Sequence, residues 1–149
     1  MPLHPLVVHA VVVLGPLAAI TGLVHALVPR WRWLLRWPLV ALALVTAIAS
    51  VIAVAAGEDL LSSRPELAPL VEEHEERGEL LRLWSIGYVV VTGLAAWALG
   101  GTSALASGRG ARETRLGIPV SALLAVGAVG LLVLLFLAGD SGARAVWGG

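Results

Sequence analysis

Long apolar runs alternate with short polar connections along the chain. Four runs, at about residues 6–28, 34–56, 80–99 and 116–138, are each close to the ~20 residues that a helix needs to cross a bilayer core. The charged residues within them are Arg36 and Arg82, each near the start of its run. Because lipid offers no hydrogen bonds to a backbone, these runs predict four membrane-spanning helices rather than strands.

The composition supports a membrane protein with a single domain. The 149 residues are 58% hydrophobic and 13% charged, about half the charged share of a soluble domain. The formal net charge is zero, so no excess of positive charge points to a nucleic-acid partner. There is no cysteine, which excludes disulfides and thiolate metal sites. We expect an all-α, polytopic fold in which the four helices form an up-down bundle in the lipid bilayer.

The longest polar stretch separates the second and third runs. It spans residues 57–79 and holds eight of the ten acidic residues. Ser63 and Glu66 have the spacing of a capping box, and apolar side chains recur at helical intervals after them. This pattern predicts a short amphipathic helix between the second and third spans, with most of its acids facing water.

The distribution of arginine predicts the orientation of the chain. Six of the ten arginines lie in the first and third connections, and four lie in the middle connection and the tails. Arginine is enriched in loops on the cytoplasmic side of a membrane. We therefore expect an integral protein of a bacterial inner (plasma) membrane, with both termini and the 57–79 segment outside the cytoplasm.

Histidines and carboxylates gather where this topology brings helix ends together. In an up-down bundle, the first and third helices begin beside the ends of the second and fourth. Ionisable groups at membrane depth are costly and tend to be functional. Imidazole suits zinc, copper and haem iron, and carboxylates shift the preference towards zinc or manganese. The candidate ligands of a divalent metal ion are His4, His9, Glu58, Asp59, His74 and Asp140.

A single b-type haem is the alternative ligand, held between His9 and His74 on the first and third helices. His25 lies at the far end of the first helix without a histidine partner, so we expect it to be a packing or interfacial residue and no second haem. The same histidines and acids can also have a purely structural role. His9 can be a core histidine bonded to Asp140 or Glu58, and Asp140 can be a turn residue between glycines.

The opening residues His4-Pro5-Leu6-Val7-Val8-His9 are similar to the HPLxVH motif of an uncharacterised four-helix membrane family, domain of unknown function 2231. Residues 57–59, 73–79 and 139–148 resemble its other landmarks. The resemblance implies the four-span topology, and relatives joined to cytochrome-like modules imply a redox setting. Members often carry a histidine where this chain has Asp140, which favours a mixed histidine–carboxylate site over an all-histidine one.

Three functions fit these observations. The first is a non-enzymatic protein that binds one metal ion or haem in electron transfer or sensing, together with a membrane partner. The second is a structural or accessory subunit whose histidines and acids only lock helix ends. The third, a proton or solute carrier, is disfavoured because the polar residues at mid-membrane are hydroxyls such as Thr46, Ser50 and Thr92. The ligand, the partner and the formation of homo-oligomers stay open.

Overall fold

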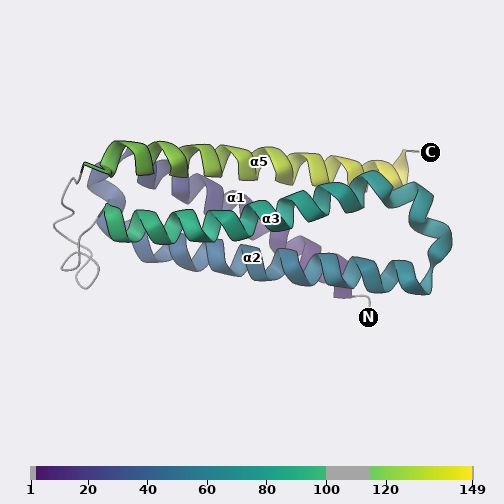
Figure 1. The fold of residues 1–149 in the computed structure, drawn as a ribbon. Coiled ribbons are helices and arrows are strands. Elements are labelled where there is room, and N and C mark those ends of the chain that lie inside the picture. The colour runs from purple at the N-terminus through teal and green to yellow at the C-terminus, as the bar shows by residue number, and fades with distance from the viewer. Residues whose placement is uncertain (1–2, 100–114, 149) are drawn as a thin grey trace.

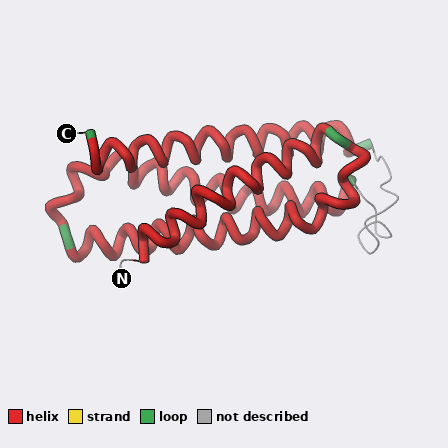
Figure 2. The backbone as a smooth tube through the Cα atoms, turned by 180° about the vertical axis from the view of Figure 1, so that it is seen from behind, coloured by secondary structure: helices red, strands yellow, loops and turns green. Residues whose placement is uncertain are grey.

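The computed structural model is an all-α bundle of long helices, and it describes residues 3–99 and 115–148 (Figures 1 and 2). The long helices are α1 (Leu3–Leu27), α2 (Arg32–Ser63), α3 (Ala68–Ala98) and α5 (Gly117–Trp147). Single 3₁₀ turns, η1 (Pro29–Trp31) and η2 (Pro65–Leu67), join α1 to α2 and α2 to α3. Within the described ranges, all four long helices are long and apolar enough to cross a membrane, as predicted.

The helices run alternately up and down, and each packs against two neighbours. α1 lies beside α2 and α5, and α3 lies beside α2 and α5, so α1 and α3 stand diagonally across the bundle. We call the end where α1 and α3 begin the histidine end, because it contains His4 and His74. The opposite end, which contains Arg32 and Arg36, is called the arginine end. The start of α1 and the end of α5 lie together at the histidine end (Figure 1).

The core is built largely from small side chains. Ala18, Ala43, Ala95 and Ala128, one from each long helix, are completely buried. Lipid tails are as apolar as this core, so burial from water does not drive helix association. Small residues instead let the helices approach closely and gain van der Waals contact.

The prediction of a separate short helix between the second and third spans is wrong. After η2, α3 continues without a break into the membrane span, so the acidic residues at 72–79 lie in its first turns. Ser63 ends α2, and its hydroxyl donates to the Leu60 carbonyl (2.8 Å) instead of capping a new helix. Gly78 lies inside α3, where Arg77 and Arg82 on either side form ion pairs one turn back along the helix.

The helices also extend beyond the predicted spans. α2 has 32 residues and α3 and α5 have 31 each, which gives lengths of about 46–48 Å. A hydrocarbon core is only about 30 Å thick. The additional turns carry charged side chains at the histidine end, including Glu58, Asp59 and Arg144. That end is therefore a polar rim made of helix rather than of loops.

At the arginine end, Arg32 completes the C-terminus of α1. Its Nε donates to the carbonyl of His25 (2.9 Å), and its Nη2 donates to the carbonyl of Ala26 (2.9 Å). The last carbonyls of a helix lack partners within it, and these bonds supply them. His25 itself is 1% exposed, and neither of its ring nitrogens has a hydrogen-bond partner in the structure.

Tyr88 connects three helices near the centre of the bundle. Its side chain extends from α3, and its hydroxyl donates to the carbonyl of Ala18 on α1 (2.8 Å). A Cβ atom added at Gly22 would lie 1.8 Å from the hydroxyl oxygen, and one added at Gly127 of α5 would lie 3.2 Å from the ring. The two glycines therefore provide the space through which the tyrosine reaches its acceptor.

Gly22→Ala is expected to lower the free energy of unfolding by about 1–3 kcal/mol, because the new methyl group overfills the core and displaces the Tyr88 hydroxyl. Gly87 on α3 is the matched control, since an added Cβ there meets nothing within 4 Å. Gly87→Ala should leave stability unchanged or raise it by up to about 1 kcal/mol, the difference in helix propensity. Denaturant unfolding in detergent micelles measures both changes.

Tyr88→Phe supplies an internal check on this contact. It removes the oxygen that the methyl group of Gly22→Ala would meet. The double variant should therefore be less destabilised than the sum of the two single variants. Strictly additive losses would show that residues 22 and 88 do not touch.

Candidate functional site

His4 and His74 meet at the histidine end of the bundle. Their ring centroids are 6.4 Å apart, and the ring planes cross at 87°. One residue lies in the first turn of α1 and the other in the second turn of α3, helices that stand diagonally across the bundle. The pair therefore joins two parts of the chain that are 70 residues apart in sequence.

Each of these rings is oriented by a hydrogen bond to the next helix. Nδ1 of His4 donates to the carbonyl of Ala53 on α2 (2.9 Å), and Nδ1 of His74 donates to the carbonyl of Ala138 on α5 (3.0 Å). Because a carbonyl only accepts, both bonds require the proton on Nδ1. Nε2 of each neutral ring then carries a lone pair that can bind a metal. A backbone carbonyl bonded to the other ring nitrogen is a usual feature of metal-binding histidines.

Both histidines lie against a glycine that follows their acceptor by one helical turn. Gly57 is four residues after Ala53, and Gly142 is four residues after Ala138. A Cβ atom at Gly57 would lie 3.4 Å from the His4 ring, and one at Gly142 would lie 3.0 Å from the His74 ring. The α1–α2 and α3–α5 hairpins thus share one local arrangement of histidine, carbonyl and glycine. The sequence analysis did not predict this arrangement, although alanine and glycine are four residues apart in both places.

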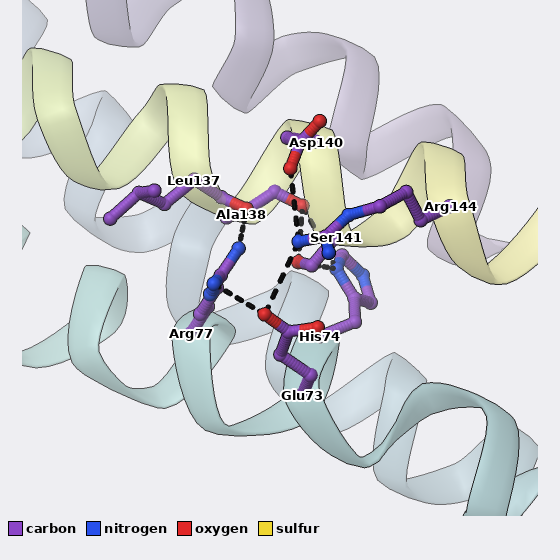
Figure 3. Close-up of polar contacts among 8 residues, drawn as sticks. All are labelled: Glu73, His74, Arg77, Leu137, Ala138, Asp140, Ser141 and Arg144. Carbon is purple, nitrogen blue, oxygen red and sulfur yellow. Dashed lines mark hydrogen bonds and ion pairs between the residues drawn. The ribbon is translucent and has the colours of Figure 1, made fainter. Parts of the chain in front are cut away.

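A network of arginines and acids surrounds His74 (Figure 3). Arg77 donates to a main-chain carbonyl of α5, that of Leu137 (3.0 Å), and forms an ion pair with Glu73. Arg144 of α5 lies 3.2 Å from Glu73 and 3.0 Å from Asp140. Two positive and two negative groups therefore tie α3 to α5 and cancel one another in charge.

The structure brings together only part of the predicted site. Within residues 3–99 and 115–148, no three histidine, cysteine, aspartate or glutamate side chains are grouped so that they could hold a metal ion. Nδ1 of His9 donates to the carbonyl of Pro5 in its own helix (2.6 Å), not to an acid, and His9 is exposed. The histidine that faces His74 is therefore His4, and not His9 as the haem hypothesis required.

The predicted carboxylate ligands lie on exposed helix surfaces. Glu58 and Asp59 are exposed on α2, which continues past them to Ser63. Asp140 is exposed and paired with Arg144. The segment 139–142 lies inside α5, so the interpretation of Asp140 as a turn residue is wrong.

Arg77 and Arg144 allow the network to be tested with a matched pair of substitutions. The Arg77 side chain is 23% exposed and also binds a helix carbonyl, whereas that of Arg144 is 53% exposed. We expect Arg77→Met to cost about 1–2 kcal/mol of unfolding free energy, because a half-buried carbonyl and carboxylate lose their donor. Arg144→Met should cost less than about 1 kcal/mol, as exposed ion pairs do. Equal losses in denaturant unfolding would contradict this ranking.

Comparison with known proteins places the chain in a family. The family model described as "Predicted membrane protein (DUF2231)" matches residues 1–149. Searches of the curated proteins and of the solved structures find no significant match. In agreement with the resemblance of its opening and closing motifs, the chain belongs to the DUF2231 family of predicted membrane proteins.

Proposed function

We propose that this membrane protein binds one metal, as an ion or as haem iron, between His4 and His74, in a non-enzymatic redox or sensing role. One observation carries the proposal. Two imidazoles from distant parts of the chain meet ring to ring, and each bonds a carbonyl through Nδ1, so that Nε2 is the nitrogen available to a metal. The arginine bias of the connections favours an extracytoplasmic position for this pair.

The donor set narrows the choice of metal. Two imidazole nitrogens suit zinc, copper, nickel and iron, whereas magnesium and calcium prefer oxygen ligands. Two protein ligands leave further coordination positions for water or for an external molecule, as in metal sites that keep an open position. A site of this kind exchanges its ligand or its electron with a membrane partner more readily than a closed structural site.

A structural role is the second candidate, and the same contacts favour it. The His4 bond ties α1 to α2, and the His74 bond ties α3 to α5. Each ring also packs against a glycine of the helix that it bonds. In this alternative, Nε2 has no function, and the two histidines serve only to fasten helix ends at the rim.

His4→Gln and His74→Gln should each weaken metal binding by more than about tenfold, because removing a ligand costs at least as much as disturbing its outer partner. Isothermal titration of the detergent-purified chain with Zn²⁺ or Ni²⁺, and visible spectra after addition of haemin, measure this binding. His9→Gln is the control, because His9 is exposed and bonded within its own helix. It should bind as the unmodified chain does.

Glycine substitutions test the same site without removing a ligand. Gly142→Ala should weaken binding by about 10–100-fold, because the new methyl group presses on the His74 ring and turns it away. Gly139→Ala is the control, since an added Cβ there meets nothing within 4 Å. If His4→Gln and His74→Gln reduce thermal stability but the chain binds no metal in any form, the structural alternative holds.

A further inference from the structure

We infer that the metal at this pair is monovalent copper, Cu(I), held by Nε2 of His4 and Nε2 of His74 in a linear arrangement. The inference rests on the proposed metal-binding function and adds the identity of the ion. Two features of the described residues support it: the distance between the rings and the small number of ligands.

The distance between the rings selects a coordination angle. With metal–nitrogen bonds of about 2 Å, and each ring centre about 1 Å behind its nitrogen, two imidazoles on opposite sides of one ion have centres about 6 Å apart. At a tetrahedral angle the same bonds would bring the centres to about 5 Å. The observed separation of His4 and His74 is 6.4 Å, which fits the linear arrangement. The 87° angle between the planes also keeps the ring hydrogens apart across the ion.

The number of ligands argues against zinc. Structural zinc sites use four protein ligands, and catalytic zinc sites use three. In the part of the chain that the structure describes, no third histidine or carboxylate joins this pair as a ligand group. Cu(I), with a filled d shell and a single charge, is stable with two nitrogen ligands in a line, and imidazole is a suitable ligand for copper.

Haem iron bound by two histidines has the same linear geometry, but it also needs a flat space for the macrocycle between the rings. Two apolar grooves run along the flanks of the bundle, one between α2 and α3 and one between α3 and α5. Neither groove is lined by His4 or His74. Haem held by the pair is therefore an outcome that the test distinguishes from a bare ion.

The experiment titrates the full-length chain in detergent, without oxygen, with Cu(I) in competition with the coloured chelator bicinchoninate. Parallel titrations use Zn²⁺ and haemin. We expect one Cu(I) ion per chain to be withheld from the chelator, and the X-ray absorption edge to show two-coordinate copper. His4→Gln and His74→Gln should each reduce copper retention by more than about tenfold, while His9→Gln retains it.

Other results would overturn the inference in distinguishable ways. Binding of Zn²⁺ or haemin at the pair without Cu(I) would remove the copper assignment and leave the proposed function standing. Binding of no metal would remove both. If His4→Gln and His74→Gln still retain copper, the ion binds elsewhere. If the absorption edge shows three or four ligands, the site is not linear. If the histidine variants fail to fold, Gly142→Ala should still retain less copper than Gly139→Ala, and equal retention would contradict the inference.

Discussion

The bundle depends on hydrogen bonds that polar side chains of its interior and its ends donate to main-chain carbonyls of the protein itself. Lipid tails supply no partner, and a helix carbonyl that already accepts one bond has a second lone pair. Tyr88, His4 and His74 use this second position on a neighbouring helix, and Arg32 donates to carbonyls at the end of α1 that lack partners within it. These bonds fix how the helices are rotated and spaced, which the non-directional packing of alanine and leucine does not.

Glycine makes these bonds geometrically available. A tyrosine or histidine ring reaches the carbonyl of a neighbouring helix only where no side chain of that helix blocks its approach. Gly22, Gly57 and Gly142 provide such places, and each would bring an added Cβ close to the ring or hydroxyl that it accommodates. Glycines that cost helix propensity in a soluble protein here allow the polar contacts on which the packing depends.

The spans and their up-down order could be predicted from the sequence, because the length and hydrophobicity of a whole helix decide whether it crosses the membrane. The site could be predicted only in part. His4 and His9 are five residues apart, so they point about 140° apart around α1, and only one can face the bundle axis. Which one does so depends on how α1 is rotated by its neighbours. Similarly, the spacing of Ser63 and Glu66 predicted the start of a new helix. In the structure the Ser63 hydroxyl instead bonds the Leu60 carbonyl of α2.

The shared arrangement in the two hairpins has a consequence for how the molecule could respond to an ion. The α1–α2 half supplies one imidazole and the α3–α5 half supplies the other, while η2 is the covalent connection between the halves among the described residues. The proposed ion between the imidazoles would therefore join the two halves a second time, at the same end as η2.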